Sequence, residues 1–147
     1  MITYLNIGDK QSILSLALQV ESLFGKMVGV RDFENALEKS LTTNKVIGYK
    51  RKNEIYGAGI INDERNEIVW FVVDSKKRGL DIGKQLLERI LGELDNNKDI
   101  FVQTFADDVP EGAAARKLYK KFGFIDKADG GLNPAGIPTV IMVKSHK

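Results

Sequence analysis

The chain has 147 residues, with 22 basic and 20 acidic side chains and a formal net charge of +2 at pH 7. This length is typical of one domain with its own core, and the balanced charge does not favour binding to nucleic acid or to an anionic membrane. No cysteine is present, which excludes disulfides and thiolate metal sites and indicates a reducing compartment. The single histidine, His146, lies next to the last residue, so we expect neither a histidine-rich metal site nor a Ser-His-Asp triad.

The first residues, Met1–Asn6, lack the basic flank and the apolar run of a signal peptide. No segment of the sequence approaches the ~20 apolar residues that a membrane span needs. We therefore expect a cytoplasmic protein without a membrane partner.

Weak alternation predicts a first strand over Ile2–Ile7. Apolar residues then recur at helical spacing and predict a helix from Asp9, as its N-cap, to Gly25, and a shorter helix over Asp32–Leu41. Three strands follow in quick succession, at Val46–Lys50, Ile55–Ile61 and Ile68–Val73. The third is apolar on both faces, which is typical of a central strand.

A strongly amphipathic helix is predicted next, with a buried stripe formed by Ile82, Leu86, Leu87, Ile90, Leu91 and Leu94. A strand over Ile100–Phe105 and a second amphipathic helix over Ala113–Phe122 follow, with Gly123 as the αL cap of that helix. The remaining expected segments are a strand that begins at Phe124-Ile125, a loop over Asp129–Pro138 and a last strand over Thr139–Val143. The order β-α-α-β-β-β-α-β-α-β-β predicts a single domain of mixed α/β (α+β) class.

The turn Arg78-Gly79-Leu80-Asp81-Ile82-Gly83, between an apolar strand and a helix, has the features of an anion site. The first N–H groups of a helix lack partners, the helix dipole adds positive potential there, and Lys76, Lys77 and Arg78 add full charges. The spacing does not fit a P-loop, because only three residues separate Gly79 from Gly83 and Gln85 follows the lysine, and no Rossmann fingerprint is present. By itself, this turn leaves a phosphate site and an ordinary strand-to-helix turn equally open.

Two motifs read together favour one ligand. Val72-Val73-Asp74, followed by Arg78–Gly83, resembles the acyl-CoA signature Arg/Gln-x-x-Gly-x-Gly/Ala of the GNAT superfamily of N-acyltransferases. The segment Ala115–Phe124 is similar to the later motif of the same family, Ala-x-x-Leu-Tyr-x-x-x-Gly-Phe. The order of the expected elements also resembles the family, so residues 1–147 are expected to form a single GNAT acyltransferase domain.

The resemblance implies a GNAT fold in which acyl-CoA lies between two splayed parallel strands, Ile68–Val73 and Ile100–Phe105, of a central mixed sheet with flanking helices. It implies acetyl-CoA as the co-substrate, bound by Val72, Val73, Arg78, Gly79, Leu80, Asp81, Ile82, Gly83 and Lys84. The acyl group would pass directly to a primary amine, without a covalent enzyme intermediate. Tyr119 matches the family's general acid, which would protonate the departing thiolate. The alternative is that Tyr119 is a core residue on an apolar helix face.

Two residues depart from the family pattern. Asp81 stands where the family has its first motif glycine, so its carboxylate would lie near a pyrophosphate unless it caps the helix instead. Gly112 stands where the family often has an asparagine, which weakens any expectation of side-chain contacts to the pantetheine arm. Asp81 is the main support for an alternative function, a catalytically weak binding or regulatory module with the GNAT fold.

The acceptor amine and the general base are not identified by the sequence. Segments around Phe24, Met27, Phe33 and the Asp129–Pro138 loop are expected to shape the acceptor pocket. Candidate carboxylates for the base are Glu67, Asp107 and Glu111, and the acidic group Asp107, Asp108 and Glu111 would suit a cationic acceptor such as a polyamine or an aminoglycoside. We expect no nucleic-acid partner, and a homodimer is compatible with the family.

Overall fold

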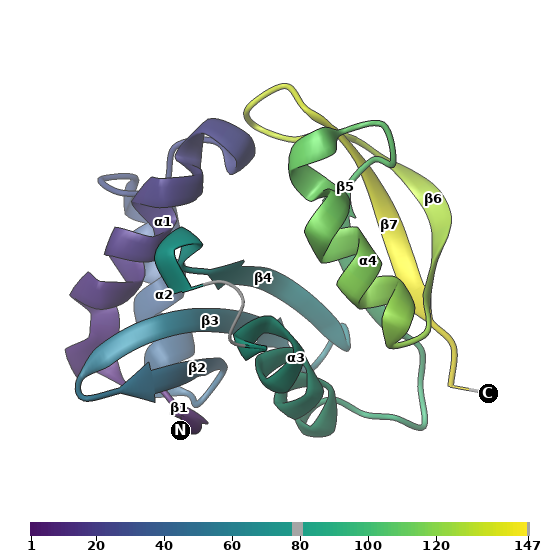
Figure 1. Cartoon of the computed structure of the whole chain (residues 1–147). Coiled ribbons are helices and arrows are strands. Elements are labelled where there is room, and N and C mark those ends of the chain that lie inside the picture. The colour runs from purple at the N-terminus through teal and green to yellow at the C-terminus, as the bar shows by residue number, and fades with distance from the viewer. Residues whose placement is uncertain (78–80, 147) are drawn as a thin grey trace.

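A computed structural model describes residues 1–77 and 81–146 of the chain (Figure 1). The described strands are β1 (Ile2–Tyr4), β2 (Val46–Arg51), β3 (Glu54–Asn62), β4 (Glu67–Val73), β5 (Ile100–Phe105), β6 (Phe124–Leu132) and β7 (Pro138–Lys144). The α-helices are α1 (Lys10–Phe24), α2 (Arg31–Thr42), α3 (Ile82–Glu93) and α4 (Ala113–Lys121). Short 3₁₀ turns lie at η1 (Ile7–Asp9), η2 (Ser75–Lys77) and η3 (Pro110–Gly112).

The described strands form one sheet in the order β1-β2-β3-β4-β5-β7-β6, in which β4 and β5 are parallel and every other neighbouring pair is antiparallel. The parallel pairing is short, because only Glu67↔Phe101 and Ile68↔Val102 are in register. Beyond these residues the two strands diverge, as Figure 1 shows. The predicted mixed sheet with splayed parallel strands is therefore confirmed.

Two apolar clusters lie on opposite faces of this sheet. One is formed by α1 and α2 with residues of β2, β3 and β4, and the other by α3 and α4 with residues from β2 to β7. The second cluster depends on a close approach of helix and strand, because a Cβ at Gly59 of β3 would overlap the side chain of Ile90 of α3. The apolar stripe predicted for α3 is buried, which follows from this packing.

The structure corrects two boundaries at the ends of the sheet. The first strand stops at Tyr4, because the side chain of Asn6 accepts a hydrogen bond from the backbone of Gly8 and begins η1. Strand β6 continues to Leu132, through residues expected to be in a loop, so the connection to β7 is only residues 133–137. The β6–β7 pairing has two register shifts, one between Asp126 and Ala128 and one around Gly130, and most residues of β6 are exposed at the sheet edge.

Candidate active site

The divergence of β4 and β5 opens two adjoining cavities. A cavity of ≈ 650 Å³ lies among α1, α4, the end of β4 and the start of α3. A larger one, of ≈ 860 Å³, lies among α2, the β3–β4 turn, β4, β5 and the β6–β7 connection. The two cavities meet, because both are lined by Phe24, Phe71, Phe105 and Ala115.

The smaller cavity brings together most of the residues expected to bind the cofactor. Its lining includes Val72 and Val73 from β4 and Asp81, Ile82, Gly83 and Lys84 from the start of α3. Arg78, Gly79 and Leu80 lie outside the described residues. A Cβ at Gly83 would lie 3.4 Å from Leu118 of α4 and 3.7 Å from Val73, which are ordinary contact distances, so the beginning of α3 packs beside both elements. The strand edge beyond Ile68 of β4 has no register partner on β5 in the described structure, which leaves backbone groups facing the split.

Asp81 does not cap α3 through its side chain. Its backbone is in the left-handed region, with φ 59° and ψ 19°, and its carbonyl oxygen accepts a hydrogen bond from the backbone N–H of Gln85 at 3.0 Å. This conformation favours glycine, and aspartate is among the few other residues that tolerate it. The capping interpretation of Asp81 is therefore wrong, and its exposed side chain stands at the N-terminus of α3 beside the cavity.

Two lysines of this cavity were missed by the sequence reasoning. Lys117 and Lys121, one helical turn apart on α4, line it together with Lys84. Their spacing is a signal in the sequence, because residues four positions apart on a helix share a face. The family motif specifies neither position, so the motif alone does not single out these lysines. Among the described residues, the cavity is therefore lined by three lysines, by the N-terminus of α3 and by the carboxylates of Asp81 and Glu111.

Tyr119 is a buried residue that also lines the larger cavity. It projects from α4 into the wall of the larger cavity and is only 3% exposed. Its ring lies between Phe71, at 6.1 Å between centroids, and Phe124, at 5.6 Å. Burial raises the pKa of the phenol well above its ordinary value of 10.0, so the hydroxyl stays protonated at neutral pH.

Helix α4 is held in place by a buried arginine. Arg116 is 4% exposed, and its guanidinium pairs with the carboxylate of Asp126 on β6 at 2.8 Å and donates to the carbonyl oxygen of Phe105 on β5 at 3.2 Å. Gly112, just before α4, has no room for a side chain, because a Cβ there would overlap Phe105. Phe105 in turn stacks on Phe24 of α1 with 5.1 Å between ring centroids. The departure at Gly112 thus accommodates an aromatic pair at the junction of the two cavities.

The larger cavity is lined by the segments expected to shape the acceptor pocket. Phe24, Met27 and Phe33 contribute to its wall, as do Asn133 and Pro134 of the β6–β7 connection. The Asn133 side chain donates to the carbonyl oxygen of Leu23 at 2.7 Å, so this connection is attached to the end of α1.

The acidic residues considered for the acceptor side lie elsewhere. Glu67, Asp107 and Asp108 line neither cavity, and Glu111 lines the smaller one. The structure therefore does not bring Asp107, Asp108 and Glu111 together in the acceptor cavity, and their proposed preference for a cationic acceptor loses its basis. Their exposed positions around η3 follow from the tight turn that precedes α4.

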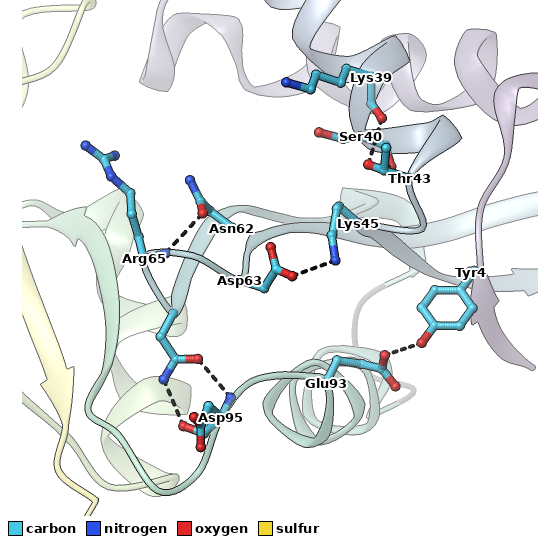
Figure 2. Close-up of polar contacts among 11 residues, drawn as sticks. Tyr4, Lys39, Ser40, Thr43, Lys45, Asn62, Asp63, Arg65, Glu93 and Asp95 are labelled. Carbon is cyan, nitrogen blue, oxygen red and sulfur yellow. Dashed lines mark hydrogen bonds and ion pairs between the residues drawn. The ribbon is translucent and has the colours of Figure 1, made fainter.

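Part of the polar lining of the larger cavity lies where α2 ends and β3 turns into β4 (Figure 2). Lys45 pairs with Asp63 at 2.8 Å, and the Thr43 hydroxyl donates to the carbonyl oxygen of Lys39 at 2.8 Å. The side-chain oxygen of Asn62 accepts from the backbone N–H of Arg65 at 3.1 Å.

Within residues 1–77 and 81–146, no cluster of three or more histidine, cysteine or acidic residues has metal-site geometry. No helix in these residues is long and apolar enough to cross a membrane.

Comparisons with known proteins agree with this geometry. A family model described as an acetyltransferase (GNAT) domain matches residues 14–146. A search of curated proteins found no match. Among solved structures, the chain is similar to a ribosomal-protein-alanine N-acetyltransferase from Brucella melitensis, with 18% identity, a TM-score of 0.77 and 99% of each chain covered.

Two further solved structures have the same fold. An N-acetyltransferase from Staphylococcus aureus Mu50 has 18% identity and a TM-score of 0.74, with 97% of this chain and 99% of that chain covered. The PaiA N-acetyltransferase from Thermoplasma acidophilum, solved in complex with coenzyme A, has 16% identity and a TM-score of 0.68, with 99% and 98% covered. The family model spans most of the sequence, and the described residues of both motifs contribute to the lining of one cavity beside the splayed β4 and β5. The protein therefore belongs to the GNAT acetyltransferase family.

Proposed function

We propose that residues 1–147 form one acyltransferase domain that transfers an acetyl group from acetyl-CoA to a primary amine in a ternary complex. The observation that carries this proposal is the pair of cavities that meet at the split between β4 and β5. One holds the acyl-CoA motif residues and the other is open to an acceptor. Such an arrangement allows direct transfer, because both substrates reach the same point from opposite sides.

The cofactor is proposed to lie along the smaller cavity. Backbone groups of Val72 and Val73 would bind the pantetheine arm, and a backbone N–H of β4 would stabilise the oxyanion that forms on the thioester carbonyl. The pyrophosphate would lie at the N-terminus of α3, on backbone N–H groups near Ile82 and Gly83, with Lys84 beside it. Arg78, Gly79, Leu80 and Asp81 belong to the same proposed binding loop.

The chemistry needs no covalent intermediate. A neutral amine attacks the thioester carbon, the C–N bond forms, the C–S bond breaks, and one amine proton is transferred overall to the departing thiolate. Tyr119 is proposed as the group that acts on that thiolate, with its phenol as donor. Because burial raises the pKa of Tyr119, while an ordinary thiol has a pKa near ~8.5, complete proton transfer from this phenol is unfavourable. Tyr119 would then stabilise the thiolate by a hydrogen bond, and the proton would come from the attacking amine.

Asp81 supports a second candidate, a GNAT-fold module that binds weakly and does not catalyse efficiently. Its exposed carboxylate stands at the α3 N-terminus, where an anionic cofactor is expected. We favour the enzyme, because Lys84, Lys117 and Lys121 offset this charge.

The absence of cysteine supports a reducing compartment, for which we propose the cytoplasm. A homodimer is compatible with the exposed edge strand β6.

Calorimetry with acetyl-CoA, followed by thiol release with a panel of amines, tests the proposal. We expect saturable binding of acetyl-CoA and amine-dependent release of free thiol. Binding without release for any amine would favour the binding module. No heat at millimolar acetyl-CoA would reject the proposed enzyme and favour the catalytically weak module.

A further inference from the structure

The wall of the larger cavity is unusually rich in aromatic side chains for a chain that is only 8% aromatic. Six of its lining residues are aromatic, namely Phe24, Phe33, Trp70, Phe71, Phe105 and Tyr119. They come from five elements, α1, α2, β4, β5 and α4. Phe33 of α2 packs edge to face on Trp70 of β4, with 6.5 Å between ring centroids. A surface of this kind favours a ligand with a large apolar or aromatic body.

The charges among the described residues that line this cavity are balanced. They are Lys39, Lys45, Asp63 and Glu64, from the end of α2, the residue before β2 and the β3–β4 turn. Figure 2 draws the first three of them. Asp63 is already paired with Lys45, which lowers the pKa of that carboxyl. Among the described lining residues, the remaining carboxylate is the exposed Glu64, so a ligand with several positive charges gains little here.

Trp70 adds an independent observation. It is 8% exposed, it lines the cavity, and its indole Nε1 is the one fully buried side-chain nitrogen or oxygen that lacks a hydrogen-bond partner within the described part of the chain. A buried N–H without an acceptor is unfavourable, and such groups are uncommon in folded proteins. Among the described residues, Trp70 therefore adds an aromatic surface to this wall and does not take part in a hydrogen-bond network.

We propose that the acceptor is a small primary amine with an aromatic body, and not a polyamine or an aminoglycoside. The acetylation of this amine rests on the proposed function, whereas binding of the aromatic amine to the larger cavity can be measured without catalysis. The aromatic ring would pack against Trp70 and Phe33, and the amine would reach the junction of the cavities near Phe71 and Tyr119. Only one nitrogen of this ligand reacts, so the cavity needs no further site for a positively charged group of the ligand.

Trp70 is the only tryptophan of the chain and therefore reports on this cavity by fluorescence. Titration of the protein with 2-phenylethylamine, without acetyl-CoA, should give a saturable change in tryptophan emission. Spermidine and ethylamine at the same concentrations should give none. A Phe33→Ala variant should bind 2-phenylethylamine about tenfold more weakly, since contact area with a ring is lost. Leu18→Ala is the matched control, because Leu18 is a 57% exposed apolar residue on α1 that lines neither cavity.

Thiol release with acetyl-CoA gives the second readout. We expect kcat/KM for 2-phenylethylamine to exceed that for ethylamine and for spermidine by about tenfold or more, as burial of a phenyl ring allows. A higher kcat/KM for spermidine or an aminoglycoside would overturn the proposal, and so would a flat fluorescence titration with a protein that binds acetyl-CoA. Saturable fluorescence with a protein that does not bind acetyl-CoA would support the aromatic pocket and refute the proposed function.

Discussion

Replacement of Asp81 separates a charge effect from a backbone effect at the start of α3. Asp81→Gly removes a carboxylate beside the proposed pyrophosphate site and places glycine at a φ of 59°. Asp81→Asn is the matched control, because it removes the charge and keeps a side chain that tolerates the left-handed conformation. The two variants therefore share the electrostatic change and differ in the backbone change.

The magnitudes follow from simple estimates. A carboxylate about 8 Å from a doubly charged pyrophosphate costs about 1 kcal/mol in a water-like dielectric, which corresponds to about fivefold in Kd. Salt at physiological strength has a Debye length of about 8 Å, so the effect should fall to about twofold there. Glycine relieves about 1 kcal/mol of left-handed strain, but it adds a similar entropy to the unfolded chain. The free energy of unfolding of Asp81→Gly should therefore stay within about 1 kcal/mol of the wild type.

Calorimetric titration with acetyl-CoA at low and at physiological salt measures these effects. Both variants should bind about fivefold more tightly than the wild type at low salt, and the gain should shrink as salt is added. An unchanged Kd for both variants at low salt would show that Asp81 does not face the cofactor phosphates. Tighter binding by Asp81→Gly alone would assign the effect to the backbone and refute the electrostatic reasoning.

Three further predictions concern α4 and its contacts. Tyr119→Phe should lower kcat for thiol release by about tenfold or more with KM for acetyl-CoA unchanged, since a hydrogen bond to a charged group contributes about 1.5–3 kcal/mol; full turnover would reject its role. Lys117→Gln with Lys121→Gln should raise KM for acetyl-CoA about threefold to tenfold and reduce its salt dependence, whereas an unchanged KM would remove both lysines from the cofactor site. Arg116 lowers the pKa of the Asp126 carboxyl, so the pair's stabilisation is present above the ordinary aspartate pKa of 3.8 and is lost as pH falls through the lowered value. Thermal unfolding should show wild type more stable than Asp126→Asn at neutral pH and the difference shrinking in acid; a constant difference would contradict the linkage.

Most of the fold could be predicted because its helices and central strands have strong periodicity. The stripe on α3 has one plausible burial pattern and is buried as expected. Strand β4 lies in the middle of the sheet, as its apolar run predicts, but its burial alternates along the strand and Val69 is 53% exposed. Strand β6 was predicted too short, because Gly130 and Gly131 are typical of a loop. Pairing with β7 stabilises this strand although its local propensity is low, and one of the two register shifts lies at Gly130.

The candidate site was harder to predict, because it depends on groups that meet only after folding. Asp81 appeared to be a helix cap, since aspartate before a helix usually caps it, and only the backbone angles show that its position is one that favours glycine. Gly112 appeared to be a lost contact, yet it makes room for Phe105, which stacks on Phe24 from the other end of the chain. No local pattern connects residues 24, 105 and 112. The stack stands where the two cavities meet, so the fit of donor and acceptor depends on a tertiary contact that sequence motifs do not contain.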